Sequence, residues 1–183
     1  MLRDLLQKVA AALDKLGVPY AVIGGLAVIT RGVVRATKDV DFLVDWPVQR
    51  AGALAQSLTE NGLSATFHRG DADDPLPGVI RIIMAYPAGP IRCDILFPSR
   101  AWQGEAVRNA ARVEVEGLGV PVVQAADLFL LKLHAGGTMD LFDAARLLEM
   151  QEKDVRRDWE KRATEIRKSK NFAKCLKFLR EGL

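Results

Sequence analysis

Two aspartates separated by a single residue, Asp39 and Asp41, begin an apolar segment that extends to Trp46. Successive side chains of a strand point to opposite faces, so both carboxylates would project from one face while their apolar neighbours enter the core. Adjacent carboxylates repel each other and raise each other's pKa unless a cation lies between them. The pair therefore predicts a metal site, and its oxygen-only ligands favour Mg²⁺ or Mn²⁺. The alternative is two surface acids on a solvent-facing strand.

A third carboxylate, Asp94, lies in a second apolar segment, Ile91 to Phe97. Its neighbours along the chain are apolar, which places Asp94 on the face opposite the core. If this strand lies beside the first, the carboxylates converge and can hold two metal ions about 4 Å apart, an arrangement that serves phosphoryl-group chemistry. The alternative is an acid paired with Arg81 or Arg92.

Gly24 and Gly25 stand between an apolar segment, Tyr20 to Ile23, and a helical pattern, Leu26 to Gly32. Glycine lets the backbone approach a phosphate closely, and the N–H groups at the start of a helix carry positive partial charge. These glycines therefore favour phosphate binding. The alternative is that they only permit close packing of helix against strand.

Basic residues accompany these candidates. Arg31, Arg35 and Lys38 precede the acid pair and could neutralise phosphates during transfer, or they could be solvated loop charges. Lys132 lies in a strongly apolar helical segment, where a lysine can simply extend its charged head into solvent.

The periodicity of apolar residues predicts an α/β (α+β) front part and a helical back part. We predict two domains, residues 1–123 and residues 124–183. The expected helices cover 2–16, 26–32, 48–61, 125–134, 139–150, 155–168 and 171–180, and the expected strands cover 20–23, 39–46, 64–68, 79–85, 91–97 and one or two segments within 113–123.

Together, Gly24-Gly25 before a helix, Asp39-Val40-Asp41 on a strand and Asp94 on a later strand resemble the nucleotidyltransferase superfamily with the DNA polymerase β-like palm. Segments 128–133 and 136–143 are similar to the helical half of the AbiEii-type abortive-infection toxins. The resemblance covers roughly residues 5–150. It implies a nucleotidyltransferase palm, with a mixed sheet flanked by helices, followed by a C-terminal helical region.

The resemblance also implies roles for the motif residues. Gly24 and Gly25 would bind the triphosphate, and Asp39 and Asp41 would hold both metal ions. Asp94 would bind the catalytic metal and help to deprotonate the acceptor hydroxyl. Many members have Gly-Ser where this chain has Gly-Gly, so one hydroxyl that could bind phosphate is absent.

Further residues and an activity follow from the same resemblance. Lys132 would contact nucleotide phosphates, and Asp140 or Asp143 would support it. The implied activity is metal-dependent transfer of a nucleoside monophosphate from a nucleoside triphosphate to an acceptor hydroxyl, with release of pyrophosphate. A non-catalytic nucleotide- or RNA-binding module with the same fold is the alternative. A toxin with an antitoxin partner, and a tRNA or protein acceptor, are expectations from the family alone.

Composition places the chain among ordinary globular proteins. It has 183 residues, 49% hydrophobic and 27% charged, and its longest apolar stretch is too short to cross a membrane. We expect a cytoplasmic protein, because the first 16 residues carry acidic and basic residues within their apolar pattern. The net charge of +3 divides into −2 for residues 1–150 and +5 for residues 151–183. The basic tail could meet nucleic acid or an acidic partner, or be a solvated helix face.

Overall fold

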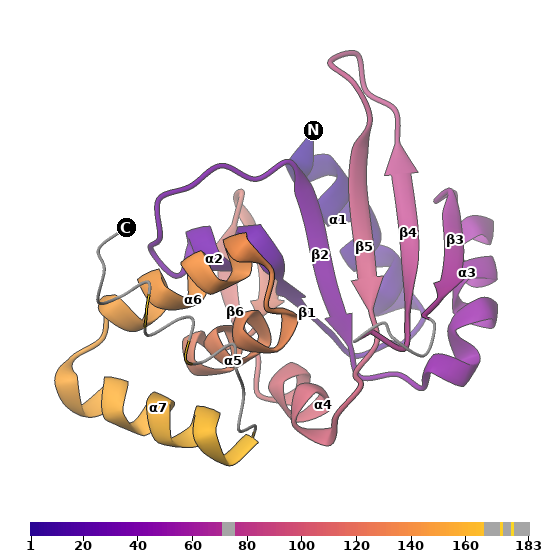
Figure 1. The fold of residues 1–183 in the computed structure, drawn as a ribbon. Coiled ribbons are helices and arrows are strands. Elements are labelled where there is room, and N and C mark those ends of the chain that lie inside the picture. Colours follow the sequence, from indigo (N-terminus) through magenta and orange to yellow (C-terminus); the bar gives the residue numbers. More distant parts are fainter. Residues whose placement is uncertain (71–75, 167–172, 174–176, 178–183) are drawn as a thin grey trace.

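The computed structural model describes residues 1–70, 76–166, 173 and 177. Within them, seven strands form one mixed sheet in the order β3-β4-β5-β2-β1-β7-β6 (Figure 1). The strands are β1 (Tyr20–Ile23), β2 (Asp39–Val44), β3 (Ala65–Arg69), β4 (Gly78–Met84), β5 (Ile91–Leu96), β6 (Ala111–Val115) and β7 (Leu118–Val122). The predicted α/β class, with a mixed sheet flanked by helices, is confirmed.

Eight helical segments surround this sheet in the described part of the chain. They are α1 (Leu2–Lys15), α2 (Gly24–Thr30), the 3-10 turn η1 (Val48–Arg50), α3 (Ala51–Glu60), α4 (Ala101–Arg108), α5 (Ala125–Ala135), α6 (Thr138–Glu149) and α7 (Lys153–Ile166). Helices α1 and α3 lie behind the sheet in Figure 1, and α4, α5 and α6 lie in front of it.

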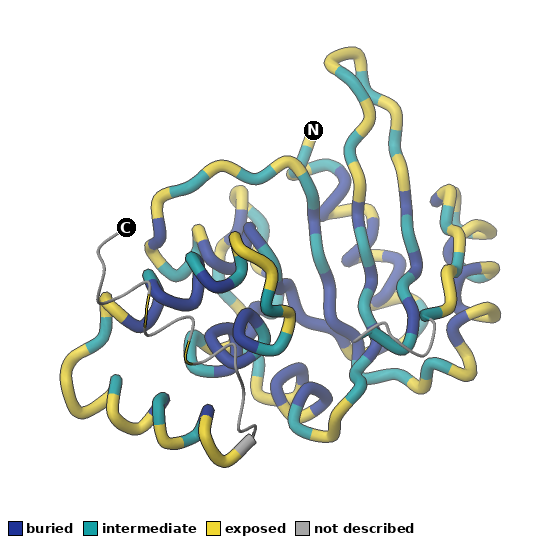
Figure 2. Tube along the Cα trace, viewed as in Figure 1, coloured by how far each residue is buried: buried dark blue, intermediate teal, exposed yellow. Residues whose placement is uncertain are grey.

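Strand β2 occupies the centre of the sheet and determines where the carboxylates lie. It pairs antiparallel with β1 and parallel with β5, so the two aspartate-bearing strands are neighbours, which is the condition under which their carboxylates converge. Val40 and Phe42 on its other face are fully buried. In Figure 2, β1 and most of β2 are dark blue, that is, buried.

Helix α1 shows how the sequence pattern builds the layer behind the sheet. Leu5, Leu6, Val9 and Leu13 recur at helical spacing, and all four are fully buried. The helix ends before Gly17, whose φ of +64° is readily adopted only by glycine. The predicted amphipathic helix is therefore confirmed.

Two helices distinguish the structure from the prediction. One was not predicted, and the other was predicted for a part of the chain that the structure largely does not describe. Helix α4 was not predicted, because its eight residues include Gly104 and lack a clear apolar stripe. Gly104 lets the helix approach Asp45 closely, since a Cβ would lie 2.6 Å from Asp45 Oδ1 and the carboxylate would have to move. The helix predicted over 171–180 falls largely outside the described residues.

The described helices α5, α6 and α7 follow the last strand, but they share one buried core with the sheet. The division into domains at 123/124 stays a prediction. None of the helices in the described ranges has the length and apolar character that a membrane span requires.

Candidate active site

The strand register brings the three predicted carboxylates onto one face of the sheet. Asp41 on β2 lies directly opposite Asp94 on β5, and Asp94 in turn lies opposite Arg81 on β4. Asp39 lies opposite Arg92 in the same parallel pairing. Directly opposed residues of paired strands share a face, so three acids and two arginines meet here.

The two arginines hold two of the three acids. Arg81 donates two hydrogen bonds to Asp94, from Nε to Oδ1 at 2.9 Å and from Nη2 to Oδ2 at 3.0 Å. Arg92 Nη2 donates to Asp39 Oδ2 at 2.9 Å, and its Nε lies 3.5 Å from Asp94 Oδ2. The alternative considered for Asp94, an acid paired with Arg81 or Arg92, is therefore present in this structure.

Asp41 is the acid that burial and its neighbours perturb most. Burial raises the pKa of its carboxyl, and the charges of Asp39 and Asp94 raise it further, to about 7. Lys132 and Arg92 act in the opposite direction and only partly offset this. The negative charge of the three carboxylates is therefore not fully neutralised by the cations around them. A divalent cation bound between them would neutralise it.

The donor set suits Mg²⁺ or Mn²⁺, because all its donor atoms are carboxylate oxygens. In the described residues, however, no three His, Cys, Asp or Glu side chains are arranged as a metal shell. The reason is visible in the ion pairs, since Arg92 and Arg81 occupy Asp39 and Asp94. A metal ion would have to take the place of these guanidinium groups. The residues fit the ion chemically, and the metal site stays a prediction.

The two glycines make room for the side chains beside them. Gly24 has a φ of +62°, and a Cβ there would overlap the carboxylate of Asp41. A Cβ on Gly25 would lie 2.5 Å from Thr37 Oγ1, and that hydroxyl donates to Asp39 Oδ1 at 2.9 Å. Both glycines thus lie close to neighbouring side chains, where a larger residue would require those side chains to move. Their binding of a triphosphate stays a prediction.

Lys132 belongs to a buried ionic network and does not extend into solvent, so that alternative is wrong. Its Nζ lies 2.8 Å from Asp140 Oδ1 and 2.9 Å from Asp143 Oδ2, and Arg35 Nη1 lies 2.6 Å from Asp143 Oδ2. Burial alone would lower the pKa of Lys132, but the two aspartates raise it above its ordinary value. Lys132 therefore stays a cation although it is only 8% exposed.

The basic residues that precede the acid pair have different surroundings. Arg31 donates hydrogen bonds to the backbone carbonyls of Val122 and Val123, and so ties the end of α2 to the end of β7. Arg35 forms an ion pair with the buried carboxylate of Asp143 on α6. Lys38 is exposed in the loop before β2.

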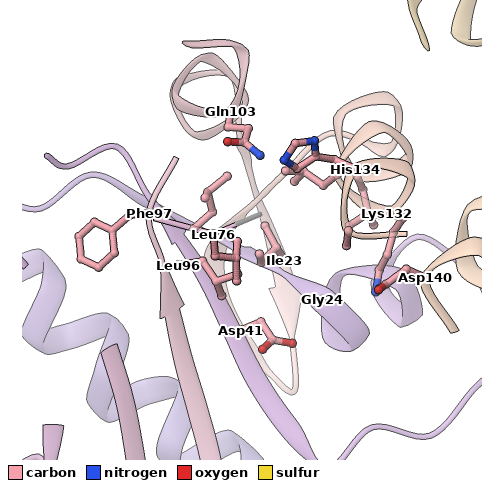
Figure 3. Close-up of a pocket in the computed structure, with 14 residues that line it drawn as sticks. Ile23, Gly24, Asp41, Leu76, Leu96, Phe97, Gln103, Lys132, His134 and Asp140 are labelled. Atoms are coloured by element: carbon pink, nitrogen blue, oxygen red, sulfur yellow. The ribbon is translucent and has the colours of Figure 1, made fainter. Parts of the chain in front are cut away.

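A cavity of about 340 Å³ begins at Asp41 and extends along the sheet beneath α4 and α5. Gly24, Asp41 and Lys132 lie at one side of it, and Gln103 and His134 lie at the far end (Figure 3). Apolar side chains, mainly leucines, line the space between these two ends.

The sequence reasoning missed Gln103 and His134. Gln103 occupies the third position of α4, as in a capping box, but the N-cap residue is Arg100 and not the Ser or Thr that makes this motif recognisable in a sequence. Nothing in the local sequence indicated that the helix faces Asp41.

Among known proteins, similarity to this chain was found in solved structures and not in sequence. No protein-family model matches the sequence, and no curated protein matches it significantly. The structure of ANT(2″)-Ia in complex with adenylyl-2″-tobramycin superposes with a TM-score of 0.59 at 16% identity, over 88% of this chain and 96% of that one. An antigenic nucleotidyltransferase-like protein from Paracoccidioides brasiliensis has a TM-score of 0.55 at 15% identity, over 96% of this chain and 92% of that one.

These similarities establish that the chain has the nucleotidyltransferase fold. The match extends over nearly the whole of both relatives, so it includes the sheet and the helices that follow it. At such low identity the likeness concerns the fold, and an activity has to be argued from the site itself.

Proposed function

We propose that the protein is a metal-dependent nucleotidyltransferase, which transfers a nucleoside monophosphate from a nucleoside triphosphate to an acceptor hydroxyl. One observation carries the proposal. Asp39, Asp41 and Asp94 lie side by side on neighbouring strands of a nucleotidyltransferase fold, and Asp41 also lines a cavity large enough for part of a nucleotide.

In this proposal Asp39 and Asp41 would hold two Mg²⁺ or Mn²⁺ ions, and Asp94 would hold the catalytic one. When bound, the ions neutralise phosphate charge and favour in-line displacement. Asp94 accepts the proton of the acceptor hydroxyl at a carboxylate oxygen. Arg81 and Arg92 hold Asp94 and Asp39 in place in this structure, and a metal ion would compete with them for the carboxylate oxygens.

The phosphate groups have several candidate partners. The backbone at Gly24 and Gly25 borders the carboxylates closely enough to meet a triphosphate bound between them. Lys132 has three N–H donors, of which two point to Asp140 and Asp143. The third is then available for a phosphate oxygen. Lys38, exposed before β2, is a second cation for the same role.

The test is a transfer assay with labelled triphosphates, Mg²⁺ and a panel of acceptors, read as pyrophosphate release and label transfer. We expect metal-dependent transfer that falls by at least about a thousandfold in an Asp39→Asn/Asp41→Asn variant. Asp45→Asn is the matched control, because Asp45 ends the same strand segment but pairs with Arg108 outside the cavity. Undiminished transfer by the double variant would refute the proposal.

A second candidate is a non-catalytic nucleotide- or RNA-binding module. The observation that favours it is the pairing of Arg92 with Asp39 and of Arg81 with Asp94, which leaves neither acid free for a metal ion. Calorimetry separates the two functions. Tight triphosphate binding without pyrophosphate release under any metal condition would support the module.

The finer expectations rest on the family resemblance alone. They are a toxin role, an antitoxin partner, and a tRNA or protein acceptor. Expression of the chain without a partner tests the first of them, because a toxin would arrest growth. Normal growth would contradict it. A cytoplasmic location is a separate proposal, which rests on the charged residues within the apolar pattern of the first 16 residues.

A further inference from the structure

The carboxamide of Gln103 closes the end of the cavity opposite Asp41. Gln103 is the third residue of α4, and only 3% of its surface is exposed. Figure 3 shows it beside His134, with the apolar side chains between it and Asp41. A buried amide at the end of an apolar cavity needs hydrogen-bond partners, so its surroundings indicate what the cavity accepts.

Three donors fix which way this carboxamide faces. Oε1 accepts hydrogen bonds from the backbone N–H groups of Ser99 and Arg100 at 2.6 and 3.0 Å, and Ser99 Oγ lies 3.2 Å away. Only the oxygen can accept from a backbone N–H, so exchanging the oxygen and nitrogen would break both bonds. The NH₂ group is thereby held in one orientation.

The NH₂ group itself has no partner among the described residues. None of their hydrogen bonds starts at Gln103 Nε2, and the nitrogen is not sealed away from the cavity. It therefore presents N–H donors, and no acceptor, to whatever enters. Leaving such a donor unpaired when a ligand covers it costs about 1–3 kcal/mol.

The rest of the cavity has the character of a site for a flat, largely apolar ring. Leu43 and Leu96 from the sheet and Leu128 and Leu131 from α5 line it between its two polar ends. Ligand sites of this type bind through apolar contacts and obtain their specificity from a few polar groups. Gln103 is such a group.

The position of the cavity favours the nucleotide over the acceptor. Lys132 and Asp41, which the proposed function assigns to phosphate and metal, line this cavity. Asp94, which it assigns to the acceptor hydroxyl, does not line it. A triphosphate held near Lys132 would therefore direct its base toward Gln103, while the acceptor approaches from the side of β4 and β5.

We propose that the cavity receives the base of the nucleoside triphosphate with its purine 6 or pyrimidine 4 substituent at Gln103. Gln103 then selects guanine and uracil, which carry a keto oxygen at that position, over adenine and cytosine, which carry an amino group there. The proposal rests on the proposed function. The keto oxygen at purine C6 or pyrimidine C4 accepts from the fixed NH₂ group, whereas an amino group at the same position would place donor against donor. Because Oε1 is committed to Ser99 and Arg100, the side chain cannot turn over to suit an amino group there.

Calorimetric titration of the full chain with GTP, UTP, ATP and CTP in the presence of Mg²⁺ tests this. We expect GTP and UTP to bind at least about tenfold more tightly than ATP and CTP. Gln103→Glu is the sharpest variant, because it keeps the accepting oxygen and replaces the NH₂ group by a second oxygen. It should weaken GTP and UTP binding by about tenfold or more and reverse the ranking.

Gln7→Glu is the matched control, since Gln7 is exposed on α1, behind the sheet. It should leave all four affinities unchanged. Equal or inverted ranking in the wild type overturns the inference even if Gln103→Glu fails to fold. An unchanged ranking in a folded Gln103→Glu protein overturns it as well.

The outcomes also separate this inference from the proposed function. Ranked binding without any transfer supports base selection and refutes the enzyme. Metal-dependent transfer with no ranking supports the enzyme and refutes base selection. A folded wild-type protein that binds none of the four nucleotides refutes both.

Discussion

Replacement of Asp41 by asparagine is expected to stabilise the metal-free protein at pH 8 and to leave its stability almost unchanged near pH 4. Asparagine has the shape of the protonated acid but cannot ionise. Burial, and then the charges of Asp39 and Asp94, raise the pKa of the Asp41 carboxyl from its usual 3.8 to about 7. Ionisation of Asp41 therefore opposes folding.

The size and the pH window follow from these two values. Below pH 3.8 the carboxyl is protonated in both the folded and the unfolded chain, so its ionisation has no effect on stability. Between pH 3.8 and about 7 the unfolded chain loses the proton first, and the wild-type protein loses stability as the pH rises. At about 1.4 kcal/mol for each pH unit, the loss is complete above pH 7 and is at most about 4 kcal/mol.

The assay is urea unfolding in EDTA at several pH values from 4 to 8, followed by tryptophan fluorescence and circular dichroism. The free-energy difference between Asp41→Asn and wild type should grow from near zero to about 4 kcal/mol over this range. Asp45→Asn is the control, because Asp45 is paired with Arg108. Its removal should cost up to about 1 kcal/mol.

Two results would refute the reasoning. One is an Asp41→Asn protein that is no more stable than wild type at pH 8. The other is a gain of the same size at pH 4, because that would come from packing and not from charge. If Asp41 also binds the metal, Mg²⁺ with nucleotide should stabilise the wild type and not the variant.

Three further substitutions test other parts of the site. Lys132→Met should lower the free energy of unfolding, measured in urea, by about 3 kcal/mol, because the buried carboxylate of Asp143 keeps only Arg35 as a partner. An unchanged free energy would show that the ion pair with Lys132 does not stabilise the fold. Gly24→Ala should lower the free energy of unfolding by about 2 kcal/mol or more, because φ is positive there and a Cβ would overlap the Asp41 carboxylate. The control is Gly52→Ala in α3, which has open space around it and should not lower the free energy of unfolding. Arg92→Gln should tighten Mn²⁺ binding up to about fivefold by electron paramagnetic resonance, since Asp39 loses a competing cation, and weaker binding would show that Arg92 helps to hold the site.

Much of the fold follows from local patterns that the sequence displays. The alternation around Asp39 and Asp41 assigns both acids to one face, and the apolar periodicity before Gly17 specifies α1. Helix α4 was missed because its short, glycine-containing sequence carries little periodicity. It forms where Gly104 lets the helix pack against the end of β2.

The candidate site was predictable as a set of residue types and much less so as a set of contacts. Asp94 and Lys132 stand out in the sequence because each is a charged residue within an apolar segment. The sequence could not show that Arg81 holds Asp94 through two hydrogen bonds, or that Lys132 has two carboxylate partners. Strand pairing and helix packing decide such distances.

The sequence by itself determined which residues could do chemistry here and toward which face of a strand each would point, because side-chain direction is a local property of the backbone. Only the tertiary structure decided which charges meet. Arg35 and Asp143 are separated by 108 residues and form an ion pair, and Gln103 reaches the cavity of Asp41 from a helix that follows another strand. Electrostatic and hydrogen-bonded partners are chosen by distance in space, which spacing along the chain does not encode.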